Sequence, residues 1–119
     1  KESDIDNIEE QNMILDIGKN TVKLIKNEIS KSKTVFWNGP LGVFETSPFD
    51  RGTVEIAKFI SNLTANNKIR SFAGGGDTIS ALDLARVKDK FSYVSTGGGA
   101  LLELIEGKKL PGLVALGIL

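Results

Sequence analysis

The sequence contains no cysteine and no histidine. Disulfide bonds, thiolate nucleophiles, Cys/His zinc sites and histidine general bases are therefore all excluded. The remaining metal ligands are oxygen atoms of carboxylate, amide, hydroxyl and carbonyl groups, which suit hard cations such as Mg²⁺. Any metal that this chain binds should therefore be oxygen-ligated.

An excess of charge of one sign and long apolar runs are also missing. Fifteen basic residues balance fifteen acidic ones. A cluster of lysine and arginine interleaved with aromatic residues, which is typical of a nucleic-acid-binding surface, is missing. No apolar run approaches the ~20 residues of a transmembrane helix. The chain begins at Lys1, without an initiator methionine or a signal-peptide pattern. We therefore expect part of a longer, cytoplasmic protein that binds neither nucleic acid nor a membrane.

Short apolar runs alternate with segments of helical periodicity. They predict strands at 13–17, 34–37, 69–73, 91–95 and 113–116, and helices at 22–29, 56–63, 79–86 and 101–105. The run at 34–37 is apolar on both faces, which is typical of a central parallel strand. Alternating strands and helices indicate βαβ units. The predicted fold class is therefore α/β, with a Rossmann-like parallel sheet whose ligands bind beyond the carboxyl ends of the strands.

Two glycine triplets stand where a predicted strand passes into a predicted helix. They are Gly74, Gly75 and Gly76, and Gly97, Gly98 and Gly99. Backbone N–H groups and the positive end of the helix dipole attract anions at such junctions, and glycine lets phosphate oxygens approach closely. Two such loops could hold a polyphosphate, whereas the alternative is that the glycines only make tight turns. Neither triplet continues as a Walker A or a dinucleotide-binding motif.

Asp77 and Thr78 follow the first triplet directly. A carboxylate beside a phosphate-binding loop can take Mg²⁺, and a hydroxyl group can bond a phosphate oxygen. Aspartate is also a favoured N-cap residue, which stabilises a helix by ~1 kcal/mol. Asp77 could therefore bind metal, cap the helix, or do both.

Another mixed segment, NGPLGVFE, leaves the predicted strand 34–37. Glu45 could accept hydrogen bonds from ribose hydroxyl groups, while Pro40 and its apolar neighbours could form a wall for a base. The alternative is that the apolar residues belong to the core and that Glu45 is merely solvated.

Three long stretches closely resemble the carboxyl-terminal region of phosphoglycerate kinases. They are WNGPLGVFE (37–45), AGGGDT (73–78) and STGGGALLELIEGKKLPG (95–112), and the shorter stretches LDIG (15–18), PFDRGT (48–53) and FSYVS (91–95) follow the family's order and spacing. The resemblance implies that residues 13–119 form the C-terminal portion of a nucleotide-binding domain, about half of a doubly wound domain. Residues 1–12, which are polar and mostly acidic, would be a lead-in segment outside its core.

The resemblance implies a glycolytic kinase that transfers a phosphoryl group between 1,3-bisphosphoglycerate and ADP, with ATP/ADP and Mg²⁺ bound. Full-length members are two-domain, usually monomeric enzymes. By the family pattern the nucleotide-binding residues are Asn38, Pro40, Glu45, Gly74, Gly75, Gly76, Asp77 and Thr78. Asp77 would also engage Mg²⁺, and Gly97, Gly98 and Gly99 would be the catalytic residues that face the transferring phosphoryl group.

The family's basic residues that grip the triose substrate lie in segments that this sequence does not contain. The partner 3-phosphoglycerate is therefore expected only for a full-length enzyme. Losing a transition-state arginine in comparable reactions costs ~10³-fold or more in rate, so we expect the isolated chain to be inactive. The alternative is a non-catalytic module that binds a nucleotide or another anion.

Overall fold

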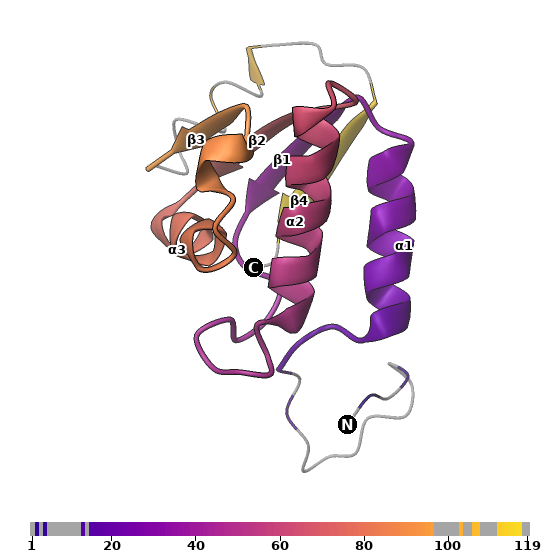
Figure 1. Ribbon diagram of the computed structural model, residues 1–119, viewed down its shortest axis with the longest axis vertical. Coiled ribbons are helices and arrows are strands. Elements are labelled where there is room, and N and C mark those ends of the chain that lie inside the picture. Colours follow the sequence, from indigo (N-terminus) through magenta and orange to yellow (C-terminus); the bar gives the residue numbers. More distant parts are fainter. Residues whose placement is uncertain are drawn as a thin grey trace.

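The computed structural model describes residues 2, 4, 13, 15–96, 103, 106–107 and 112–117, which form an α/β fold (Figure 1). The helices are α1 (Lys19–Ser30), α2 (Arg51–Ala65) and α3 (Gly76–Leu84), with a short 3-10 helix η2 (Lys88–Lys90). The strands are β1 (Thr34–Asn38), β2 (Arg70–Gly74), β3 (Tyr93–Ser95) and β4 (Leu113–Gly117). No helix in this described part of the chain is long and apolar enough to cross a membrane.

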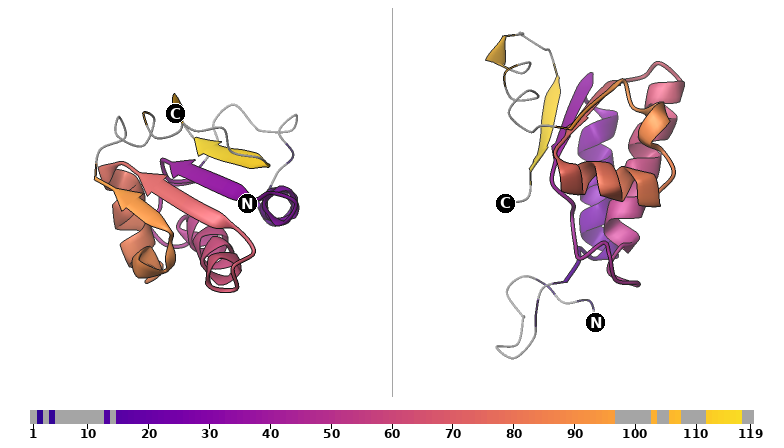
Figure 2. Two further views of the ribbon diagram at one scale, coloured as in Figure 1. Left: turned by 90° about the horizontal axis from the view of Figure 1, so that it is seen from above. Right: turned by 90° about the vertical axis from the view of Figure 1, so that its left-hand side faces the viewer.

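The four strands form one sheet in the order β3-β2-β1-β4. β1 pairs in parallel with β2 on one side and with β4 on the other, and β2 pairs in parallel with β3. Figure 2 shows that α1, α2 and α3 all lie on one face of this sheet. The predicted Rossmann-like parallel sheet, with β1 at a central position, is therefore confirmed.

The hydrophobic core lies between the sheet and the helices. Val35 and Trp37 of β1 are 0% exposed and belong to the same cluster as Ile56 and Ile60 of α2. The two isoleucines are part of the apolar stripe with helical spacing that predicts α2. Because removing this apolar area from water is the main favourable term in folding, the stripe fixes α2 against the sheet.

Aromatic side chains line up across the strands in alternation with these core residues. The strand register pairs Phe36 with Phe72 and Phe72 with Tyr93. The rings of Phe36 and Phe72 are stacked with centroids 4.9 Å apart, and those of Phe72 and Tyr93 lie 6.4 Å apart. β1 is therefore apolar on both faces, as predicted for a central strand of a parallel sheet.

The predicted strand at 13–17 is wrong, since Met13 and residues 15–17 belong to no strand. The carbonyl oxygen of Leu15 instead accepts a hydrogen bond from the N–H of Val43, at 2.8 Å, in the loop that follows β1. Leu15 therefore bonds a loop rather than a neighbouring strand, and this single backbone bond makes no ladder.

β3 begins at Tyr93, two residues later than predicted. The Ser71 N–H donates to the hydroxyl oxygen of Ser92 at 3.0 Å, and the Ser92 N–H donates to the hydroxyl oxygen of Ser71 at 3.2 Å. The two hydroxyl groups thus replace backbone carbonyls as acceptors, so the regular ladder starts only after Ser92.

α3 is shorter than the sequence predicts. α3 ends at Leu84, and Arg86 has a φ of +60°, which is incompatible with the predicted helix to 86.

Of the lead-in segment the structure describes Glu2 and Asp4, and the Glu2 carboxylate accepts a hydrogen bond from the Lys19 N–H at 2.9 Å. The predicted helix at 101–105 lies outside the described residues except for Glu103, which is helical.

We expect Ser71→Ala to destabilise the fold, because Ser71 is fully buried and its hydroxyl accepts from Ser92 while bonding the Thr64 hydroxyl at 2.8 Å. Removing a partner of buried polar groups should lower the free energy of unfolding by about 1–3 kcal/mol, as measured by urea denaturation. Ser30→Ala, at an exposed hydroxyl at the end of α1, is the matched control and should stay within about 0.5 kcal/mol. Equal effects of the two substitutions would contradict the structural role of Ser71.

Candidate functional site

The carboxyl ends of three neighbouring strands lie level with one another. The register pairs Asn38 of β1 with Gly74 of β2, and Gly74 with Ser95 of β3. The N–H of Gly75 donates to the carbonyl oxygen of Ser95 at 3.2 Å, so the loop after β2 is tied to the end of β3. The residues expected to bind phosphate after β1 and β2 therefore come together at one edge of the sheet.

Gly75 is at a position that only glycine can occupy without strain. Its φ is +95°, and a Cβ atom there would lie 3.1 Å from the Oδ1 atom of Asn38. Side-chain-bearing residues rarely adopt this conformation. The Asn38 side chain therefore reaches across to the glycine loop.

The hydroxyl group of Thr78 joins the two loops. It accepts a hydrogen bond of 2.6 Å from the N–H of Gly39, and Thr78 is only 1% exposed. The sequence predicted a hydroxyl group beside phosphate, but it gave no sign of this bond, because the two residues are 39 positions apart. Thr78 thus fixes the start of α3 relative to the loop after β1.

The N-terminus of α3 is open. Gly75 occupies the N-cap position and no side chain caps the helix, so the interpretation of Asp77 as the N-cap is wrong. The N–H of Ile79 bonds the carbonyl oxygen of Gly75, which leaves the N–H groups of residues 76–78 without an acceptor inside the helix. Gly76 and Asp77 are exposed, and a Cβ atom on Gly76 would meet nothing within 4 Å.

The loop after β1 has an inner and an outer side. Leu41 and Phe44 are buried, as the core interpretation of this segment predicted for its aromatic residue, whereas Val43 is 42% exposed. Pro40 is half-buried and Glu45 is exposed. Part of Pro40, the apolar side chain of Val43 and the carboxylate of Glu45 therefore remain at the surface of this loop.

The donor set fits Mg²⁺ only in part. No group of three or more acidic side chains that could hold a metal ion occurs among the described residues. Mg²⁺ is usually bound by one or two carboxylates together with substrate phosphates rather than by an all-protein cage. The single exposed carboxylate of Asp77, in the first turn of α3, fits an ion that arrives with phosphate groups.

The predicted catalytic residues Gly97, Gly98 and Gly99 lie outside the described residues. The segment is described up to Thr96, which is exposed and follows the carboxyl end of β3.

We expect Thr78→Val to loosen the contact between the two loops, because valine has nearly the same shape but offers Gly39 no acceptor. The free energy of unfolding should fall by about 1–3 kcal/mol, and the Gly39 amide should exchange its hydrogen faster. Thr78→Ser keeps the hydroxyl group and is the matched control. If the Gly39 amide exchanged its hydrogen equally slowly in the valine and serine variants, the bond between Gly39 and Thr78 would not be what holds the loops together.

Comparison with known proteins places the chain in a family. The model of the family "Phosphoglycerate kinase" matches residues 1–108. The chain is 53% identical over 113 residues to phosphoglycerate kinase of Chelativorans sp. (strain BNC1), covering 95% of this chain and 28% of that protein. It is 54% identical over 110 residues to phosphoglycerate kinase of Buchnera aphidicola subsp. Schizaphis graminum (strain Sg), covering 92% and 27%.

A solved structure agrees with these sequence comparisons. Phosphoglycerate kinase from Coxiella burnetii matches with a TM-score of 0.77 and 40% sequence identity, over 88% of this chain and 26% of that chain. This chain spans about 28% of the length of the curated relatives it matches. The family-model match over residues 1–108, far more than half of the sequence, shows that the chain belongs to the phosphoglycerate kinase family.

Proposed function

We propose that this chain is the ATP/ADP-binding part of a phosphoglycerate kinase. The whole enzyme would transfer a phosphoryl group reversibly between 1,3-bisphosphoglycerate and ADP in glycolysis. The observation that carries the proposal is the N-terminus of α3, which no side chain caps and where the N–H groups of residues 76–78 have no acceptor inside the helix, beside the loop after β1. Family membership supports the identity of the reaction.

The phosphate end of the nucleotide would lie at α3. The N–H groups of residues 76–78 and the positive end of the helix dipole favour an anion there. Open space in front of Gly76 lets phosphate oxygens approach the backbone. Thr78 is buried and its hydroxyl accepts from Gly39, so it would hold the first turn of α3 in place beside the phosphates.

The nucleoside end would lie along the loop after β1. The half-buried Pro40 offers an apolar surface to the adenine ring, and the exposed Glu45 offers a carboxylate to the ribose hydroxyl groups. Asn38, whose side chain reaches Gly75, would stand between this end and the phosphates. Asn38 ends β1, and Pro40 and Glu45 lie in the loop that follows it.

Asp77 would hold the Mg²⁺ that accompanies the phosphates, and when bound this ion neutralises charge on the phosphate oxygens. Gly97, Gly98 and Gly99 would supply further backbone N–H groups to the transferring phosphoryl group. Phosphoryl transfer depends mainly on positioning and charge stabilisation, so a chain without histidine is suited to it. The 119 residues alone would bind nucleotide without turnover, because triose binding belongs to other parts of a full-length enzyme.

We expect Gly76→Ala to weaken MgADP binding without harming the fold. The added methyl group meets no protein atom within 4 Å, and alanine is favoured over glycine in a helix by about 1 kcal/mol. In the proposed site the methyl group would stand between the N–H groups and a phosphate. The dissociation constant, measured by calorimetry on the 119-residue chain, should rise about tenfold, the equivalent of one hydrogen bond to a charged group.

Asn20→Ala, at an exposed position in the first turn of α1, is the control and should leave MgADP binding unchanged. The proposal is wrong if wild-type chain binds neither MgADP nor pyrophosphate. Binding of pyrophosphate with no preference for ADP would instead favour the alternative function, a non-catalytic anion-binding module.

We expect Asp77→Asn to remove the effect of Mg²⁺ on ADP binding. In the wild-type chain the carboxylate repels bare phosphates but attracts the ion, so ADP should bind more tightly with Mg²⁺ than without it. In the variant the two dissociation constants should converge. Asp83→Asn, at an exposed carboxylate on the far end of α3, is the matched control; an unchanged Mg²⁺ effect in Asp77→Asn would exclude Asp77 as the ligand.

A further inference from the structure

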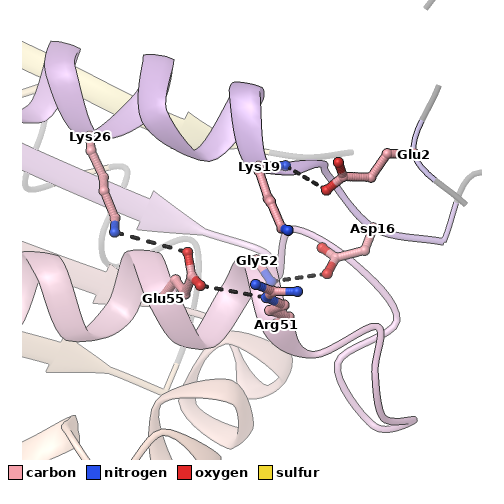
Figure 3. Close-up of polar contacts among 7 residues, drawn as sticks. All are labelled: Glu2, Asp16, Lys19, Lys26, Arg51, Gly52 and Glu55. Carbon is pink, nitrogen blue, oxygen red and sulfur yellow. Dashed lines mark hydrogen bonds and ion pairs between the residues drawn. The ribbon is translucent and has the colours of Figure 1, made fainter. Parts of the chain in front are cut away.

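The segment 15–17 is inserted between the loop after β1 and the start of α2. One Asp16 carboxylate oxygen accepts from the Gly52 N–H at 2.9 Å, and the other accepts from the Ile17 N–H at 2.8 Å. The neighbouring Leu15 carbonyl accepts from the Val43 N–H at 2.8 Å. Figure 3 shows the Asp16 side chain directed at Gly52, at the beginning of α2. One short segment therefore bonds both the helix and the loop.

The Asp16 carboxylate also fills the space between these two elements. A Cβ atom on Gly42 would lie 2.5 Å from the Oδ1 atom of Asp16 and 2.8 Å from the carbonyl oxygen of Phe49. A Cβ atom on Gly52 would lie 2.6 Å from the same Oδ1 atom. Real Cβ atoms do not approach so closely, so both positions require glycine. The loop and the helix thus both pack closely against the Asp16 carboxylate.

Asp16 acts as the cap that α2 otherwise lacks. The N-cap residue Asp50 makes no side-chain capping bond, whereas Asp16 accepts from Gly52 across 36 positions of sequence. A negative charge at a helix N-terminus is favourable. The contact therefore orients the start of α2 as well as the loop.

The surroundings of Asp16 do not favour its charge. Burial raises the pKa of Asp16, and repulsion from Asp50 raises it further, while the hydrogen bonds from Gly52 and Ile17 and the charge of Arg51 partly offset this. The other charged groups near this junction are Lys19 at the start of α1, Glu2 and Glu55 (Figure 3). Ionising Asp16 in the folded chain therefore costs free energy relative to the unfolded chain.

We propose that Asp16 is a positioning residue of the nucleotide site, whose carboxylate sets the place of the loop that carries Pro40 and Glu45. The contact with Gly42 and the bond from Val43 to Leu15 lie between these two residues in the loop. On the other side, the Leu41 N–H donates to the Thr53 hydroxyl of α2 at 3.1 Å. The inference rests on the proposed function for the identity of the ligand, although the loop position can be measured without one.

The first test is Asp16→Asn in the 119-residue chain. The amide has nearly the same shape but only one acceptor oxygen, so it turns N–H donors toward Gly52, Ile17 or Gly42. Without ligand, the NMR amide signals of residues 41–45 should shift and the Val43 amide should exchange faster. The affinity for MgADP should fall about tenfold, the equivalent of one hydrogen bond, while the affinity for pyrophosphate, which needs only α3, should stay within twofold.

Asp50→Asn is the matched control, because it removes the same charge from the same helix end without touching Gly42. It should change neither the amide signals of residues 41–45 nor MgADP affinity by more than twofold. Gly42→Ala is the second variant, since its methyl group would stand 2.5 Å from the Asp16 carboxylate and 2.8 Å from the carbonyl oxygens of Leu15 and Phe49, while the charge of Asp16 stays. It should give the same selective loss of MgADP affinity, and it keeps the inference testable if Asp16→Asn does not fold.

The stability of the folded chain should depend on the ionisation of Asp16. Because the folded-state pKa of Asp16 lies above its usual value of 3.8, the ionised form is disfavoured by folding. The free energy of unfolding of the wild-type chain, relative to Asp16→Asn, should therefore fall as the pH rises from below 3.8 through the folded pKa. A carboxylate whose pKa is lowered by folding would instead make the free energy of unfolding rise with pH.

The outcomes separate this inference from the proposed function. If the wild-type chain does not bind MgADP, the proposed function fails, and the amide signals of residues 41–45 still decide whether Asp16 places the loop. Unchanged signals and MgADP affinity in both Asp16→Asn and Gly42→Ala would overturn the positioning role. Equal losses of MgADP and pyrophosphate affinity would also overturn it, because they would indicate general damage to the fold.

Discussion

The hydrogen bond between the Gly39 N–H and the buried hydroxyl of Thr78 is the contact on which the candidate site depends. At 2.6 Å it joins the loop after β1 to the first turn of α3. Parallel pairing alone brings strand ends to one edge of a sheet, but it leaves the loops beyond them free to diverge. With this bond in place, the first turn of α3 stays beside the start of the loop after β1.

Close backbone approach is the second constraint, and glycine meets it in two different ways. Gly75 needs a positive φ to turn from β2 into α3 beside Asn38, whereas Gly42 and Gly52 make room for the Asp16 carboxylate. Gly76 has no such need, since open space lies in front of it. Among the described residues, packing therefore does not require glycine at this position.

Local patterns in the sequence predict the fold well and the site only in part. The stripe with Ile56 and Ile60 and the apolar run of β1 determine their own elements, because burial follows directly from periodicity. The run at 13–17 is equally apolar, but its Leu15 bonds a loop and not a strand. Ser71 and Ser92 exchange side-chain bonds that no periodicity signals. The convergence of the loops after β1 and β2 follows from topology, so it was predictable. The bonds from Gly39 to Thr78 and from Gly52 to Asp16 join residues more than 30 positions apart, so no local pattern could reveal them.

The two ends of the proposed nucleotide site rest on different physical supports. The phosphate end uses main-chain N–H groups of α3, whose direction is fixed by the helix itself and which need no particular side chain. The base and ribose end would use a loop, which Thr78, Thr53 and the segment 15–17 hold at Gly39, Leu41 and Val43. If the proposed site is correct, substitutions far from the phosphate end would change recognition of the nucleoside while anion binding persists. Such a division would let the scaffold keep its phosphate contacts and adjust its nucleoside contacts through residues outside the site.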